Sequence, residues 1–163
     1  MTKMCEIMTE SYSLSELGKC IKMTLKTAFA EPVWVRAEIS EMHENVSGHC
    51  YLDLIEKADD TDVWVAKQKA TIWAFTYRML KPYFESETGA TLRAGMKVLL
   101  LCEVEFHEVY GVSLNVRDID PAFTVGEMAV RRAEIIRRLT DDGIVDMNKQ
   151  QPLAPVPQRV AVI

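Results

Sequence analysis

The sequence predicts a mainly β fold with flanking helices, in which five strands form a Greek-key barrel. Two observations carry this prediction. The apolar residues change from helical spacing to a period of two at Pro32, and that period recurs in five short segments up to Ile119, with one helical stretch after the third. With 163 residues, 48% of them hydrophobic, the chain can also bury one sizeable core without a disulfide or a metal.

The first helix is predicted over residues 14–29. Ser13 and Glu16 have the spacing of a capping box, in which each side chain accepts a hydrogen bond from the other residue's backbone N–H. Pro32 ends the helix, because proline disfavours a helical conformation at the residue before it. The apolar residues at helical spacing are Leu14, Leu17, Ile21, Leu25 and Phe29.

Three strands are predicted next, because apolar and polar residues alternate along each of them. The first covers residues 33–40, the second residues 49–54 after a turn at Ser47–Gly48, and the third residues 69–74. The loop before the third strand is acidic and holds Asp59, Asp60 and Asp62.

A helical crossover and a hairpin complete the predicted barrel. Residues 75–87 lose the alternation and fit a helical stripe that Pro82 interrupts. Two further strands, over residues 97–107 and 112–119, are joined by a short connection at Tyr110–Gly111. Three strands, a helical crossover and a hairpin form the element order of an OB-fold, with the ligand-binding face on its second and third strands.

The rest of the chain predicts a helix over residues 125–139, a proline-rich linker, and a short apolar strand at residues 159–163. That strand is typical of the start of a parallel-sheet domain that the sequence cuts short; the alternative is an edge strand at a native C-terminus. The expected organisation is a flexible start over 1–12, the N-terminal helix plus barrel over 13–122, a connecting helix over 123–142, and the linker plus first strand over 143–163.

Composition excludes several classes of protein. No apolar run approaches the roughly 20 residues that cross a bilayer, and the first residues lack a secretion signal, so we expect a soluble, cytoplasmic protein. The four cysteines include no Cys-x-x-Cys pair, and the three histidines have no ligand spacing. We therefore expect neither a metal site nor a cofactor. The net charge of −5 argues against a protein that binds nucleic acid over its whole surface.

One stretch nevertheless combines the residue types that single-stranded nucleic acid requires. Residues 63–84 contain four basic and six aromatic residues but no acid. Bases stack on aromatic rings and phosphates attract cations, so we expect the outer face of the second and third strands to bind a single strand, with two first-strand residues adjacent. The alternative is that the rings pack beneath a loop or helix and the lysines are merely solvated. The candidate residues are His49, Tyr51, Lys67, Lys69 and Trp73, with Trp34 and Arg36 on the first strand.

No catalytic arrangement is evident in the sequence. It has no glycine-rich phosphate loop, no nucleophile elbow and no carboxylate pair placed opposite a histidine. If the full protein is an enzyme, its chemistry is expected outside these residues.

Several segments, in the same order along the chain, resemble the N-terminal part of the exodeoxyribonuclease VII large subunit family. In the barrel these are residues 33–40, 47–54, 95–99 and 106–111, and in the tail they are residues 143–146, 152–153 and 157–163. The resemblance implies a bacterial cytoplasmic exonuclease that degrades single-stranded DNA from both ends without a divalent metal. It also implies a small subunit as partner, and a catalytic domain that begins at Arg159. This fragment is then expected to bind DNA and to be inactive alone.

The chain departs from the family at the hairpin, where Val109–Tyr110 replaces a frequent Pro-Arg before the glycine. Tyr110 could stack on a base in place of the arginine, or be a turn residue with no ligand role. A competing hypothesis, supported by the net charge and the acidic loop, is a protein-interaction or oligomerisation module that spaces subunits without contacting DNA. A homodimer is compatible with both the DNA-binding hypothesis and this competing one.

Overall fold

The computed structural model describes residues 11–58 and 63–150. The chain divides into two compact units, residues 1–124 and residues 125–163. The helices are α1 (Leu14–Ala28), α2 (Ala74–Thr88), α3 (Pro121–Asp141) and the short 3₁₀ helix η1 (Met147–Gln150). The strands are β1 (Val33–Glu44), β2 (Cys50–Lys57), β3 (Trp64–Ile72), β4 (Lys97–His107) and β5 (Gly111–Ile119).

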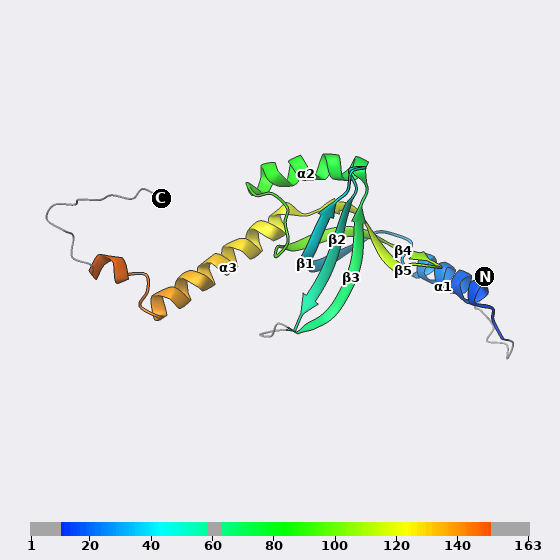
Figure 1. The fold of residues 1–163 in the computed structure, drawn as a ribbon, viewed down its shortest axis with the longest axis horizontal. Helices are drawn as coiled ribbons and strands as arrows, with labels where there is room; N and C mark the ends of the chain where they lie inside the picture. The colour runs from blue at the N-terminus through cyan, green and yellow to red at the C-terminus, as the bar shows by residue number, and fades with distance from the viewer. Residues whose placement is uncertain (1–10, 59–62, 151–163) are drawn as a thin grey trace. The chain divides into compact units, whose positions relative to one another are not determined.

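The five strands form a closed barrel in the order β1-β2-β3-β5-β4, which confirms the predicted fold (Figure 1). All neighbouring strands are antiparallel except β3 and β5, which pair in parallel at two positions. Strand β1 takes part in both halves of the barrel. Its first part, from Val33 to Glu38, pairs with β4, and its second part, from Glu38 to Glu44, pairs with β2. A bulge between Ile39 and Glu41, within the part that pairs with β2, bends the strand.

The core fills the barrel with the apolar side chains that alternate along its strands. Helix α2 lies across one end of the barrel (Figure 1) and adds Tyr77 and Phe84, which are 4% and 1% exposed. Burial of side chains of this size stabilises a fold by roughly 1.5–3 kcal/mol each. The strand residues with at most 1% exposure are Ile39, Cys50, Leu52, Ala70, Ile72, Val98, Leu100, Cys102 and Val116.

Helix α1 begins at the predicted capping box. Ser13 Oγ accepts a hydrogen bond from the Glu16 N–H at 3.3 Å, and Glu16 Oε2 accepts one from the Ser13 N–H at 2.8 Å. The helix packs on β4 through Gly18, the buried residue of α1, where an added Cβ would lie 3.2 Å from Glu108 Cγ. Lys22 reinforces this contact with an ion pair to Glu108 at 3.2 Å.

The predicted third strand is misplaced by several residues. β3 begins at Trp64 and not at residue 69. The prediction missed this start because residues 64–67 are all exposed and show no alternation of apolar and polar positions. It ends at Ile72, so Trp73 and Ala74 are not strand residues. Trp73 is the N-cap of α2, with an extended backbone of φ −66° and ψ 149°, and Ala74 is the first helical residue.

Three other boundaries differ from the prediction. β1 continues to Glu44 beyond its bulge. Helix α2 runs through Pro82 without the expected interruption, since proline removes only one intrahelical hydrogen bond and the core contacts of Tyr77 and Phe84 flank it. Helix α3 begins at Pro121, because proline is favoured at the first helical position.

Some expectations fall on residues outside those that the structure describes. These are the flexible start within residues 1–10, the acidic residues of the loop at 59–62, and the linker and strand over 151–163. In the described residues, no helix combines the length and apolar character needed to span a membrane.

Candidate nucleic-acid interface

The outward side chains of β2 and β3 form one continuous surface, named here the β2–β3 face. Strand alternation produces it, because Leu52 and Leu54 of β2 and Ala70 and Ile72 of β3 point into the core. The outward residues pair in register across the strands, Tyr51 with Thr71 and Asp53 with Lys69. The β2–β3 face consists of Tyr51, Asp53, Lys67, Lys69 and Thr71.

The charges on the β2–β3 face largely offset one another. Lys67 Nζ lies 2.7 Å from Asp53 Oδ2, and the hydrogen bond to this carboxylate raises the pKa of Lys67. Lys69 lies opposite Asp53 and makes no ion pair with another described residue. On β1, Glu41 also lies opposite Asp53. Two lysines therefore face two carboxylates, so phosphate attraction at this surface depends mainly on Lys69.

Trp64 extends the β2–β3 face toward the start of β3. Its side chain is 55% exposed, and Lys67 Nζ lies 5.5 Å from the centroid of its ring. Trp64 was not among the predicted site residues, because the predicted third strand began after it. The signal that could have identified it is its position in the acid-free aromatic stretch over residues 63–84.

One end of the β2–β3 face is bordered by the loop between β1 and β2. His49 Nδ1 accepts a hydrogen bond from the Ala74 N–H at 3.0 Å, so the imidazole links this loop to the start of α2. The same ring contacts Trp73 edge to face, with the centroids 5.0 Å apart. Asn45 Oδ1 holds the loop by accepting the His49 N–H at 2.9 Å. His49 is therefore engaged within the protein, whereas Trp73 remains 44% exposed.

The β4–β5 hairpin contacts the middle of β3. Gln68 Nε2 donates to the Val112 carbonyl oxygen at 2.6 Å, which joins the hairpin to β3. At its tip, Tyr110 is 84% exposed and lies on His107, with ring centroids 4.8 Å apart. Tyr110 thus presents an exposed aromatic ring at the hairpin tip, where the neighbouring Glu108 contacts Gly18 and Lys22 of α1.

Residues 12–120 match the family model described as an OB-fold nucleic acid binding domain. This match covers most of the chain and agrees with the strand order of the barrel. The chain belongs to this family.

The chain is also similar to large subunits of exodeoxyribonuclease 7, which confirms the resemblance seen in the sequence. It is 38% identical to that of Deinococcus radiodurans over 92% of this chain and 36% of the relative. It is 32% identical to that of Agrobacterium fabrum, over 93% of this chain and 26% of the relative, and 27% identical to that of Halalkalibacterium halodurans, over 93% and 30%. The chain spans only about a third of the length of these curated relatives.

A solved structure of the dimeric N-terminal domain of PriB from Thermoanaerobacter tencongensis is a more distant match. It shares 13% identity, with a TM-score of 0.33 over 56% of this chain and 94% of the other. The fold assignment of the OB-fold domain therefore depends on the strand order and the family match alone.

The OB-fold domain brings together most of the candidate residues, but not the two on β1. Trp34 and Arg36 pair with Leu101 and Leu99 of β4, not with β2. The expectation that they lie adjacent to the second and third strands is wrong, because β1 pairs with β2 only from Glu38 onward. Tyr110 lies apart from that face as well, at the tip of the β4–β5 hairpin. The candidates at the β2–β3 face or its ends are His49, Tyr51, Lys67, Lys69 and Trp73.

Proposed function

We propose that this chain is the single-stranded DNA-binding module of a bacterial exonuclease large subunit. It holds a strand on the β2–β3 face for a catalytic domain elsewhere in a longer protein. The family match and the naming of the curated relatives as exodeoxyribonuclease 7 large subunits support this proposal. The cytoplasmic location and the exonuclease small subunit as a partner belong to the same proposal.

The observation that carries the proposal is a series of exposed aromatic rings along one surface. Tyr51, Trp64 and Trp73 are 43%, 55% and 44% exposed, and they belong to β2, β3 and the β3–α2 junction. Stacking of a base on such a ring contributes about 1–3 kcal/mol, whatever the base. Because the lysines and carboxylates of this surface offset one another, stacking supplies more of the affinity than phosphate contacts do.

The chain binds the strand without cutting it, since the resemblance assigns the nuclease residues to the domain that follows. The test is fluorescence anisotropy of a labelled single-stranded oligonucleotide of about 30 nucleotides at low and physiological salt, with a duplex as the control. We expect preference for the single strand, with modest salt dependence. Equal affinity for the duplex, or no binding at low salt, would contradict the proposal.

A second candidate function is an assembly module, and helix α1 favours it. Part of its apolar stripe is uncovered, with Leu14, Leu17 and Ile21 exposed by 86%, 45% and 37%. Apolar surface of this kind is typical of protein contacts. Sedimentation velocity over a range of concentrations tests this function: a dimer that Leu17→Glu dissociates supports it, and a monomer at all concentrations contradicts self-association.

A further inference from the structure

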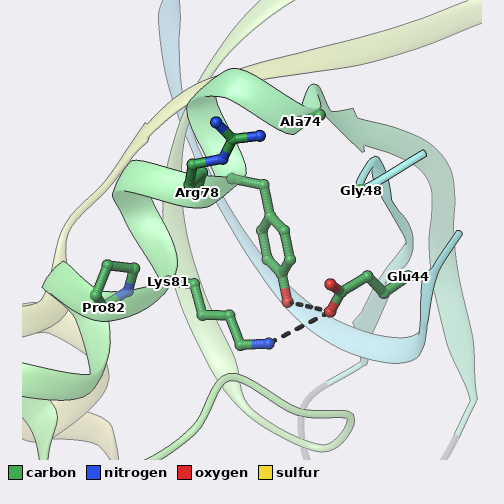
Figure 2. Close-up of a pocket in the computed structure, with 7 residues that line it drawn as sticks. Glu44, Gly48, Ala74, Arg78, Lys81 and Pro82 are labelled. Carbon is green, nitrogen blue, oxygen red and sulfur yellow. Dashed lines mark hydrogen bonds and ion pairs between the residues drawn. The ribbon is translucent and has the colours of Figure 1, made fainter. Parts of the chain in front are cut away.

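A pocket of about 250 Å³ lies between the β1–β2 loop and one side of α2 (Figure 2). Glu44 and Gly48 line it from the barrel, and Ala74, Tyr77, Arg78 and Lys81 line it from the helix. Gly48 has a φ of +80°, which favours glycine, and a Cβ there would lie 3.5 Å from the Ala74 Cβ. Small residues therefore keep this end of the pocket open.

The carboxylate of Glu44 is fixed through one of its two oxygens. Its Oε2 accepts hydrogen bonds from the Tyr77 hydroxyl at 3.2 Å and from Lys81 Nζ at 3.3 Å. Both dashed lines in Figure 2 end on this same oxygen. The other oxygen, Oε1, accepts no hydrogen bond from any described residue, so it is available to a donor on a ligand.

Arg78 supplies a positive charge at the same pocket. Its side chain is exposed, and no described residue forms an ion pair with it. Figure 2 shows its guanidinium on the side of Ala74, apart from the ion pair between Lys81 and Glu44. A guanidinium in this position suits a phosphate, to which it can donate two parallel hydrogen bonds.

The pocket adjoins the stacking residues along the chain. Ala74 directly follows Trp73, and Gly48 directly precedes His49, so the two segments that form the end of the β2–β3 face also form the pocket wall. Its volume is below the roughly 300–1,000 Å³ of sites for drug-sized ligands, so it suits a small group such as a single base.

We propose that this pocket takes one amino-bearing base of the bound strand, next to the base that stacks on Trp73. The exocyclic amino group, such as N4 of cytosine, donates to Glu44 Oε1, and the neighbouring phosphate contacts Arg78. This inference rests on the proposed function and adds a base preference to it. Uracil carries a carbonyl oxygen in place of that amino group, and the Glu44 carboxylate repels this oxygen.

The test compares oligo(dC) and oligo(dU) of about 15 nucleotides, two strands that differ in the groups at C4 and N3 of the base. Anisotropy titrations are made with the wild-type chain, Glu44→Gln and Arg78→Ala. We expect the wild type to bind oligo(dC) at least about tenfold more tightly, as for one hydrogen bond to a charged group. In Glu44→Gln, the amide oxygen keeps the bonds from Tyr77 and Lys81, so an NH₂ group faces the pocket. The preference should then disappear or reverse toward oligo(dU).

Two control variants separate the pocket from the rest of the surface. Glu87→Gln changes an exposed glutamate nine residues beyond Arg78, on the opposite side of α2, and should leave both affinities unchanged. Trp73→Ala should weaken the binding of oligo(dC) and of oligo(dU) by the same factor. Arg78→Ala should also weaken both, because a phosphate contact does not depend on the base.

Each result has a definite meaning. Equal affinities for oligo(dC) and oligo(dU) in the wild type, or a preference that Glu44→Gln leaves intact, would overturn the pocket proposal while the single-strand-binding function stands. Loss of binding to both strands at low salt in the wild type would overturn the proposed function and the pocket with it.

Discussion

The imidazole of His49 and the indole of Trp73 meet edge to face, with ring centroids 5.0 Å apart and ring planes at 88°. The same imidazole accepts the Ala74 N–H at the start of α2. A histidine whose Nδ1 accepts a backbone hydrogen bond is fixed in orientation, and it fixes the ring beside it. His49 therefore positions Trp73, and the aromatic surface of the proposed DNA site depends on a residue that need not contact DNA.

Two substitutions of His49 should separate its hydrogen bond to the Ala74 N–H from the contact of its ring with Trp73. In His49→Asn the side-chain oxygen can take the place of Nδ1, whereas His49→Ala leaves the Ala74 N–H without its acceptor. We expect His49→Ala to lower the free energy of unfolding by about 1 kcal/mol, measured by urea denaturation, and His49→Asn to cost less. DNA affinity, measured by anisotropy, should fall in the same order. Full DNA affinity in His49→Ala, with Trp73 still required, would show that His49 does not position Trp73.

Removal of an exposed ring at the β2–β3 face should weaken DNA binding, and removal of an exposed ring elsewhere on the barrel should not. Trp73→Ala and Tyr51→Ala should each cost about 1–3 kcal/mol of binding free energy, at least about fivefold in Kd, and Tyr51→Phe should retain the affinity. Trp34→Ala is the matched control, because this exposed tryptophan belongs to the β1–β4 pairing. A larger loss for Trp34→Ala than for Trp73→Ala would place the strand on the other side of the barrel.

The two lysines of the β2–β3 face should differ in their effect on salt dependence. Lys69→Ala should reduce the slope of log K against log salt by about 0.7, as expected for one phosphate contact of a single strand. Lys67→Ala should change it less, because Asp53 already offsets the Lys67 charge at 2.7 Å. Asp53→Asn should leave the Lys67 charge without its carboxylate partner, so DNA should bind more tightly and the slope of log K against log salt should become steeper. Weaker binding by Asp53→Asn, in a variant that still folds, would contradict this charge balance.

The buried thiols should make the fold sensitive to alkaline pH. Burial raises the pKa of Cys50 to about 11 and that of Cys102 to about 12, from 9.0 in the absence of burial. Between pH 9 and these values, the unfolded chain loses thiol protons that the folded chain retains, so stability is complete below pH 9 and falls above it. At pH 10 the loss is about 1.4 kcal/mol for each thiol.

Urea denaturation at pH 8, 9 and 10 measures this effect. The double variant with Cys50→Ala and Cys102→Ala should show a flatter pH dependence than the wild type, even if it is less stable at every pH. Cys20→Ala is the control, because Cys20 is only partly buried. Identical pH dependence in the wild type and the double variant would rule out the thiols as the cause.

The fold was largely predictable because most elements carry a strong local signal. Ser13 and Glu16 mark the start of α1, and the alternation at Ile39, Leu52 and Val98 marks strands whose one face is buried. The start of β3 was not predictable in this way. Its first four residues, beginning at Trp64, are exposed on both faces, so burial leaves no period in the sequence.

The candidate site was predictable in composition but not in arrangement. Aromatic and basic residues are visible in the sequence. The change of partner along β1, from β4 to β2 at Glu38, is not, and it separates Trp34 and Arg36 from Tyr51. The pairing of Lys67 with Asp53 likewise depends on the β2–β3 register, which only the folded barrel defines. The pocket at Glu44 was missed because its walls come from two segments 30 residues apart, Glu44 and Ala74.

The barrel closes through its shortest pairing, between β3 and β5, where two register positions and the Gln68 side chain join the strands. On its other side, β3 pairs with β2 at eight positions. Thermal opening of the barrel therefore begins at the β3–β5 junction, and β3 moves together with β2 when it does. The surface that carries Tyr51 and Lys69 stays intact during such a motion, so a bound strand could remain in place while the barrel beneath it opens and closes.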